Sequence, residues 1–284
     1  MKEREIAKSV EKRPYFEEVA TPPVPEQDDG TREMGELYPF LISGGTNTER
    51  YYFIHINDKT EYKFNIKPKY FNDESNYTEA FPKRINEILN VNNDVKIFCV
   101  FDWDTIRGNK TKLEKHEAFE KQFQAEISNG TVTLCPSMPS IEYWFLLHFK
   151  NYTKLLKNYR EVSNVLAPHL RQCFGNPQVR LKKLLKNEEN LKDAMWVEKL
   201  CANGKLALAI ERAENNINTA VTAGEIESQS YSYVYKVFKK HNVQYRAICS
   251  FTNIKRIFLD KLYRKLKSLK HLFLQVISAL SYYR

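Results

Sequence analysis

One segment constrains the fold more than any other. The run Val95–Phe101 is almost wholly apolar and ends at the charged triplet Asp102–Asp104. A strand that is apolar on both faces is typical of a parallel sheet covered by helices on both sides. Shorter apolar runs predict further strands, with helical patterns between them: strands over 37–42, 62–66 and 131–135, and helices over 48–57, 77–91 and 110–127. Thr46 or Thr48 is expected to cap the first of these helices. This alternation predicts an α/β fold with a mostly parallel sheet flanked by helices.

From Ser140 onward the pattern becomes mainly helical, with helices expected over 140–149, 151–173, 178–186, 189–215 and 230–241. Pro168 is expected to break the second of these, because proline lacks an amide hydrogen and crowds the preceding turn. The patterns predict four parts: a mobile polar arm over 1–36, an α/β domain over 37–150, a helical extension over 151–252 and a basic amphipathic helix over 253–284.

The cysteines and the apolar runs indicate in which cellular compartment the protein is located. Five cysteines are widely spaced and none forms a C-x-x-C pair, which argues against a disulfide framework and against a zinc knuckle. The N-terminal residues lack the apolar stretch of a secretory signal. The longest apolar-leaning stretch, His271–Ala279, is too short to span a bilayer. A cytoplasmic protein without a membrane span is therefore expected.

The formal net charge is +9, which favours a polyanionic partner such as DNA or RNA. Seven of these nine charges belong to residues 255–284, so the rest of the chain is nearly neutral. Lys182 and Lys183 lie in a smaller basic stretch, which is either a solvated helix face or a phosphate contact. Candidate nucleic-acid contacts are Lys182, Lys183, Lys261, Arg264 and Lys265.

The amphipathic C-terminal helix has three possible roles. Its apolar stripe could pack on the rest of the chain or on the same helix of a second copy, giving a homodimer. Its basic face could instead hold nucleic acid, and a membrane-surface helix is the third possibility.

Three acidic features follow predicted strands or short loops. Asp102 and Asp104 end the central strand, Glu49 follows the turn Ser43–Thr48, and Glu142 follows the strand over 131–135. Ligands of open α/β sheets bind outside the carboxyl ends of the strands, where these residues would meet. Carboxylate oxygens are the ligands that Mg²⁺ prefers, and two such ions can clamp the attacking and leaving oxygens of a phosphodiester.

Each acidic feature also has a plainer interpretation. A D-x-D sequence at a strand end is often a polar loop or a helix cap. Glu49 suits the first turn of a solvated helix, where the helix dipole favours a negative charge. Glu142 begins an apolar helix and could simply cap it, with Ser140 either orienting it or binding a phosphate. The conjunction of the three features favours a shared site.

Three blocks of the sequence resemble the RloB-like family. Phe40–Phe53 resembles the first family motif, which is a strand, then E-G-x-x-T-E, then an aromatic pair. Val100–Asp104 resembles the family's V-F-D-x-D, and Pro139–Phe149 resembles its third block nearly residue for residue. Ala207–Ala213 and Ser230–Phe238 resemble its helical end, so the resemblance covers roughly residues 37–240.

RloB-like proteins are similar to Toprim-domain proteins, the metal-binding module of topoisomerases and primases. The resemblance implies a Toprim-like α/β fold with an α-helical C-terminal extension. It also implies Mg²⁺- or Mn²⁺-dependent nuclease activity and a role in bacterial antiviral defence, alongside restriction or CRISPR proteins as partners. Carried over, the metal-binding and catalytic residues are Asp102, Asp104, Glu142 and Glu49, with Ser140 and Thr48 supporting them or contacting phosphate.

The first motif departs from the family pattern at one position. Gly44 stands where the family has the first glutamate of E-G-x-x-T-E. Three explanations remain open: Glu49 takes over its role, the protein binds metal and nucleic acid without cleaving, or the sequence carries a substitution at this site. The second explanation makes the chain a catalytically degenerate binding or scaffolding component of a defence complex.

Overall fold

The computed structural model describes residues 38–45, 47–69, 77 and 79–239. The predicted arm over 1–36 and the predicted C-terminal helix over 253–284 lie outside the described residues, as do Lys261, Arg264 and Lys265. The homodimer expected through that helix therefore stays a prediction.

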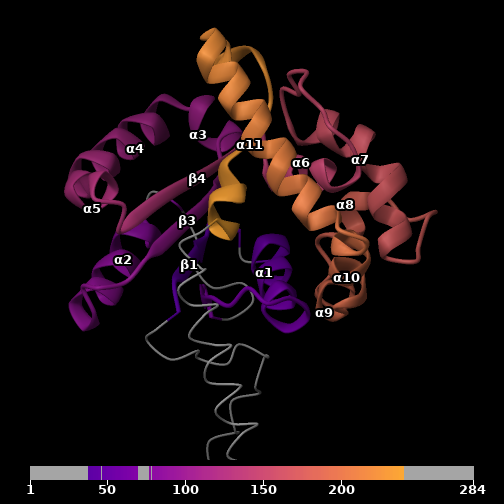
Figure 1. The fold of residues 1–284 in the computed structure, drawn as a ribbon, viewed down its shortest axis with the longest axis horizontal. Coiled ribbons are helices and arrows are strands. Elements are labelled where there is room, and N and C mark those ends of the chain that lie inside the picture. The colour runs from indigo at the N-terminus through magenta and orange to yellow at the C-terminus, as the bar shows by residue number, and fades with distance from the viewer. Residues whose placement is uncertain (1–37, 46, 70–76, 78, 240–284) are drawn as a thin grey trace, which may run out of the picture.

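The described residues form a five-stranded sheet in the order β2-β1-β3-β4-β5. The strands are β1 (Phe40–Ser43), β2 (Asn65–Lys67), β3 (Ile97–Asp102), β4 (Val132–Met138) and β5 (Tyr231–Ser232). All neighbouring pairs are parallel except β4 with β5, which is antiparallel. The α/β fold with a mostly parallel sheet flanked by helices is thus confirmed (Figure 1).

Strand β3 lies at the centre of the sheet, and its side chains alternate between two apolar cores. Phe98 and Val100 pack in one core, whereas Ile97, Cys99 and Phe101 pack in the other. Because all five side chains are buried, the apolar character of this segment follows from coverage on both faces.

Two unequal sets of helices cover these faces, as Figure 1 shows. The smaller set, with residues in the second core, is α2 (Ala80–Val91), α3 (Asp104–Arg107), α4 (Lys110–Gln122) and α5 (Gln124–Ser128). The larger set is α1 (Thr48–Lys59), α6 (Ile141–Phe149), α7 (Tyr159–Cys173), α8 (Leu181–Leu184), α9 (Glu188–Lys192), α10 (Met195–Cys201) and α11 (Lys205–Ala223). The short 3-10 helices η1 (Ile226–Ser228) and η2 (Tyr233–Phe238) precede and follow β5.

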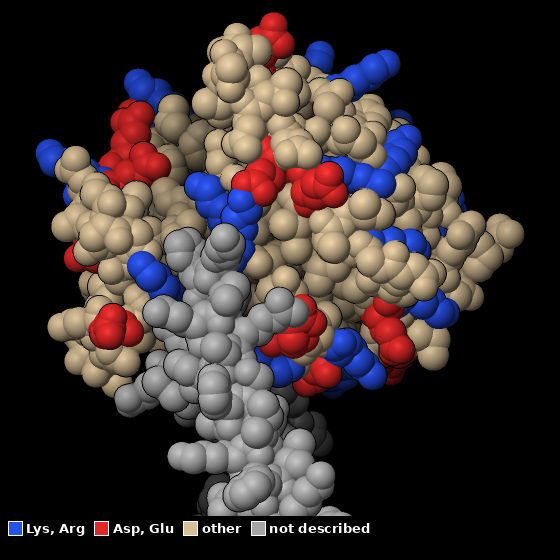
Figure 2. Space-filling model, viewed as in Figure 1, with Lys and Arg blue, Asp and Glu red and all other residues tan. Residues whose placement is uncertain are grey.

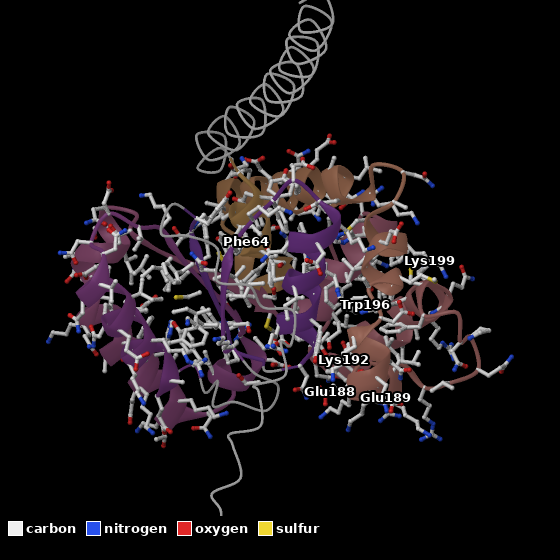
Figure 3. The ribbon with its side chains drawn as sticks, turned by 90° about the horizontal axis from the view of Figure 1, so that it is seen from below. Phe64, Glu188, Glu189, Lys192, Trp196 and Lys199 are labelled. Atoms are coloured by element: carbon white, nitrogen blue, oxygen red, sulfur yellow. The ribbon has the colours of Figure 1, made fainter. Side chains whose placement is uncertain are left out.

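Buried aromatic side chains hold the larger set together. Trp144 of α6 donates a hydrogen bond from Nε1 to the Tyr52 hydroxyl of α1 at 2.9 Å and stacks on Phe238. Figure 3 shows Trp196 of α10 within the larger helical set, and it is almost fully buried. This core joins residues from both sides of position 150, since it runs from Leu41 to Phe238.

Several predicted helices differ from those observed. The helix predicted over 189–215 is three helices, because Asn203 and Gly204 both adopt positive φ between α10 and α11 and turn the chain. The helix predicted over 110–127 is likewise divided at Phe123 into α4 and α5.

Pro168 does not break its helix, although the helix begins only at Tyr159. The buried residues Val162, Leu166 and Leu170 continue the apolar face of α7 across the proline. Burial of that face against α6 and α10 outweighs the cost of the proline, which is about 3 kcal/mol in a helix interior.

The helix predicted over 230–241 was also wrong at its start, where Tyr231 and Ser232 form β5. Ser232 pairs with Ser137 of β4, and their hydroxyls lie 2.8 Å apart. In the described part of the chain, none of the helices combines the length and the apolar character needed to cross a bilayer.

Candidate active site

The predicted acidic residues gather where β1 and β3 end. The amide of Gly44 donates to the carbonyl of Val100 at 2.7 Å, which extends the β1–β3 pairing past Ser43. Helix α1 begins four residues later, at Thr48, so Glu49 lies in its first turn. Asp102 ends β3 on the neighbouring strand, and both carboxylates line the same cavity.

Gly45 makes room for Glu49. A Cβ atom at position 45 would overlap the carboxylate of Glu49, which lies directly over the glycine. A Cβ atom at position 44 would meet the Cβ atom of Phe101 at 3.2 Å, which is close but without overlap. The turn therefore needs glycine at position 45 for the observed placement of Glu49, whereas a side chain at position 44 would require the neighbouring Phe101 to shift by a few tenths of an ångström.

Asp102 is tied to the start of α6. Its Oδ1 atom accepts a hydrogen bond from the amide of Ile141 at 2.8 Å. The main chain adds two links, because Trp103 N donates to Ser137 O at 2.9 Å and Asp104 N donates to Pro139 O at 3.2 Å. These bonds hold the end of β3 against the start of α6, where Ser140 is the N-cap and Glu142 lies in the first turn.

Ser140 and Glu142 form a buried pair. Ser140 occupies the N-cap position of α6, but its side chain makes no capping bond. Its hydroxyl donates instead to Oε2 of Glu142 at 2.5 Å. Both residues are buried, so Ser140 orients the carboxylate of Glu142, which is one of the two roles that the sequence suggested.

The carboxylates act on one another's protonation. Burial raises the pKa of Asp102 well above its ordinary range, and the charges of Glu49, Glu142 and Asp104 raise it further. Burial and the charge of Glu142 raise the pKa of Glu49 to about 7. The pKa of Glu142 is also raised, by burial above all, although the Ser140 hydrogen bond and Lys186 oppose the rise. Asp102 is thus the centre of a cluster of four carboxylates.

Asp104 is the outermost member of the cluster. It is only partly buried, at the first position of α3, and burial raises its pKa. The charge of Lys112 on α4 opposes this rise. The same lysine lines a cavity of about 220 Å³, together with Gly44, Glu49, Tyr77, Phe101, Asp102, Thr105 and Ile106.

The sequence was also compared with known protein families. The sequence profile of the RloB-like protein family matches residues 40–240, which include every residue of the cluster and more than half of the chain. This chain belongs to the RloB-like family. No curated protein and no solved structure matches the sequence.

The RloB-like chain uses Thr48 for a link within the protein. Asn47 is at the N-cap of α1 and makes no side-chain capping bond, so the predicted cap at Thr46 or Thr48 was wrong. The Thr48 hydroxyl donates to the carbonyl of Leu185 at 2.9 Å, which ties α1 to the end of α8. Lys182 and Lys183 are exposed on α8, as both of their interpretations required.

Two lysines that affect the carboxylate cluster belong to no motif of the sequence. Lys112 was not selected from the sequence because it lies eight residues beyond Asp104, on a helix whose orientation only the fold defines. Lys186 belongs to the basic stretch noted in the sequence and directly follows Leu185, which accepts the hydrogen bond from Thr48. Its charge lowers the pKa of Glu142.

The donor chemistry of the cluster fits a hard divalent cation. Carboxylate oxygens are the ligands that Mg²⁺ and Mn²⁺ prefer, and a cation would relieve the repulsion between the buried acids. Among the described residues, no three His, Cys, Asp or Glu side chains already stand together in a position to hold a metal ion. Asp102 and Glu142 are instead hydrogen-bonded to Ile141 and Ser140. Metal binding at this site thus requires some of these side chains to rotate.

Proposed function

We propose that this RloB-like protein is a nuclease that cleaves phosphodiester bonds with Mg²⁺ or Mn²⁺. The observation that carries the proposal is the electrostatic coupling of Asp102 to Glu49, Glu142 and Asp104 at the carboxyl edge of the sheet. Burying several like charges is costly, and a protein that keeps them together commonly does so at a functional site.

Each acidic residue has a role in this proposal. Asp102, Glu142 and Glu49 would hold the metal, and Asp104 would bind it from the exposed side of the cluster. The bound ion would supply Lewis-acid activation of a phosphodiester and of the attacking water. Ser140 keeps Glu142 oriented through its hydrogen bond, and Gly45 leaves the space in which Glu49 lies.

Glu49 is our candidate for the role of the glutamate that is missing at position 44. Its carboxylate reaches back from α1 over Gly45, so it returns an acidic group to the end of β1. It also lines the cavity with Asp102, which is what a substitute metal ligand must do. This geometry supports the first of the three explanations for the departure from the family motif.

The test compares Asp102→Asn with Asp94→Asn, a matched change of an exposed aspartate in the turn before β3. Single-stranded and duplex oligonucleotides of DNA and RNA serve as substrates, with Mn²⁺, Mg²⁺ or EDTA. We expect metal-dependent cleavage by the wild type and by Asp94→Asn, and loss of at least a hundredfold in Asp102→Asn. Equal cleavage by the two variants would reject the assignment.

A second candidate function is binding of nucleic acid without cleavage. It is favoured by Gly44 in place of the family glutamate and by the absence of a ready-made metal site among the described residues. Under this alternative no metal supports cleavage by the wild type, and Asp102→Asn binds oligonucleotides as tightly as the wild type. Cleavage gained by Gly44→Glu would show that the lost glutamate is the cause.

The resemblance to RloB-like proteins also supports a role in antiviral defence as part of this proposal. Bacteria that express the wild type with its neighbouring genes should restrict phage growth, and those with Asp102→Asn should not. Equal plaque counts for the two would contradict a defence role that depends on this site.

A further inference from the structure

A second cavity lies where the end of α1 meets α10 and α11, and it shares no residue with the acidic cavity. We call it the α10–α11 groove. Its volume is about 470 Å³, and its wall is mainly apolar, with Val197 of α10 and Leu206 and Ile210 of α11 among its residues. The groove therefore offers an apolar surface to a ligand that can cover it.

The charged residues of the groove favour a cationic ligand. Lys59, Glu61 and Glu198 line it, and all three are exposed. Lys59 and Glu198 pair with each other at 3.7 Å. With Glu61 the groove has one more negative than positive charge. An anionic ligand such as nucleic acid does not suit this surface, whereas an apolar segment with basic residues beside it does.

The described part of the chain ends beside this groove. Phe238 packs edge-to-face on Tyr62, which lines the groove, with 5.0 Å between the ring centroids. The last described residue, Lys239, forms an ion pair with Glu214 of α11. Ile210 of the groove lies one turn before Glu214 on the same face of α11, about 6 Å along the helix axis. The residues that follow Lys239 therefore start within reach of the groove.

The basic segment 253–284 has the chemistry that the groove requires. Its apolar residues recur at steps of three and four, among them Phe258, Leu262 and Leu266, and predict one helical stripe. Seven of the nine net positive charges of the chain lie in residues 255–284. Residues 240–252 connect this segment to Lys239 and span about 45 Å when fully extended, so their length allows the segment to reach the groove.

We propose that segment 253–284 binds in the α10–α11 groove of its own chain. Its apolar stripe packs on Val197 and Ile210, and its basic residues face Glu61 and Glu198. Of the roles that the sequence left open for this segment, the proposal selects packing on the rest of the chain. It does not depend on the acidic cluster or on nuclease activity.

Cys201 serves as the probe, because it is a partly exposed residue of the groove, whereas Cys99, Cys135 and Cys173 are buried. The rate at which N-ethylmaleimide modifies Cys201 in the full chain is measured by mass spectrometry of its peptide. A docked segment covers the groove and slows this reaction.

The test variant carries Leu262→Asp and Leu266→Asp on the apolar stripe. The control carries Gln275→Asp and Ser278→Asp, which add the same charge on the face away from the stripe. We expect Cys201 to react about tenfold faster in the test variant than in the wild type, because the groove is then open. The control should react as slowly as the wild type.

A second pair of variants changes the groove and leaves the segment intact. Ala207 is exposed and lines the groove, and Ala207→Arg places a positive charge there. Ala223→Arg is the matched change at the end of the same helix, outside the groove. We expect hydrogen exchange in peptides from 253–284 to become about tenfold faster in Ala207→Arg and to stay unchanged in Ala223→Arg. Thermal melting of each variant checks that it is folded.

Two results would overturn the proposal. Equal Cys201 rates in the wild type and in the stripe variant, or equal exchange in the two arginine variants, would show that the segment does not bind in the groove. Cys201 protection that is lost on dilution, with a dimer in light scattering, would show instead that the segment of a second copy occupies it. Protection that does not depend on protein concentration supports binding within one chain.

Discussion

Helix α1 contributes to two regions whose buried polar groups differ in charge. Its first turn brings Glu49 into the acidic cluster, where neighbouring negative charges raise one another's pKa values. Its second turn brings Tyr52 into the aromatic core, where the Trp144 indole donates to its hydroxyl. In the aromatic core, burial lowers the pKa of His148 to about 3, so its imidazole is neutral at pH 7. Close packing accounts for the core, whereas like charges that are buried together oppose folding.

The described surface carries charges of both signs on the face seen in Figure 2. Figure 2 shows Lys and Arg interspersed with Asp and Glu over the visible described face. Exposed pairs such as Lys192 with Glu188, at 2.9 Å, are typical of this mixed surface and contribute little to folding. Figure 3 shows both residues at the edge of the molecule. The buried acidic cluster is the exception, and the following predictions test the contrast.

The largest effect is expected from Trp144→Ala in the aromatic core. This change removes a fully buried indole, its stacking on Phe238 and the hydrogen bond to Tyr52. We expect the free energy of unfolding to fall by about 3–5 kcal/mol, measured by urea denaturation. A loss below about 1 kcal/mol would mean that this core contributes little to the stability of the fold.

The next effect is a pH dependence of the free energy of unfolding, which comes from the acidic cluster. Glu49 has an ordinary pKa of 4.5 and a pKa of about 7 in the folded protein, so the folded state binds more protons than the unfolded state between these values. Stability from this group is therefore fully present below about pH 4.5 and is lost as pH rises to about 7. Asp102 and Glu142 act in the same direction, since their pKa values are also raised.

Mn²⁺ should reverse that loss, because a divalent cation binds the ionised carboxylates. We expect the melting temperature to rise more on adding Mn²⁺ at pH 8 than at pH 5. Ca²⁺-free EDTA buffer provides the baseline, and Asp102→Asn provides a matched protein with a weakened site. If Mn²⁺ raises the melting temperature equally at both pH values, or equally in both proteins, the acidic cluster does not bind the ion.

A smaller effect of opposite sign is expected for the stability of Asp102→Asn. The amide removes a buried charge and still offers an oxygen to the Ile141 amide. Unfolding at pH 8 without metal should require about 1–2 kcal/mol more than in the wild type, as is common when an acidic functional site is neutralised. Chemical denaturation measures this, and a destabilised variant would indicate that the charge stabilises the fold.

The smallest effect is expected from Thr48→Val, which removes the bond to the Leu185 carbonyl. Stability should fall by about 1 kcal/mol. Hydrogen exchange should become faster near Leu185 and should stay unchanged around Trp144, because the bond that is lost ends at Leu185. Faster exchange at both would show that the regions are coupled.

The sequence predicts the parts of this fold whose patterns are local. Strand β3 is evident because coverage on both faces demands an unbroken apolar run. The positions of Asp102 and Glu142 follow from that strand and the next, since residues after parallel strands meet at one edge. Asp104, Glu49 and Ser140 could be chosen by the same reasoning, and the structure brings all of them to this edge.

The features that the sequence did not predict depend on contacts between residues that are far apart in the chain. Strand β5 has two residues and no alternation of its own, and it exists because Ser232 meets Ser137, 95 positions earlier in the chain. Pro168 continues its helix because of packing from α6 and α10, which no local pattern shows. Lys112 likewise gained its place beside Asp104 only through the packing of α3 against α4.

The pairing of β5 with β4 has a consequence for how the chain is made. Until residue 232 has left the ribosome, Ser137 and Met138 of β4 lack their partners in β5. A nascent or shortened chain that stops near residue 150 therefore exposes an open strand edge, which is prone to self-association. Strand β5 therefore joins the sheet only after nearly all of the described residues have been synthesised.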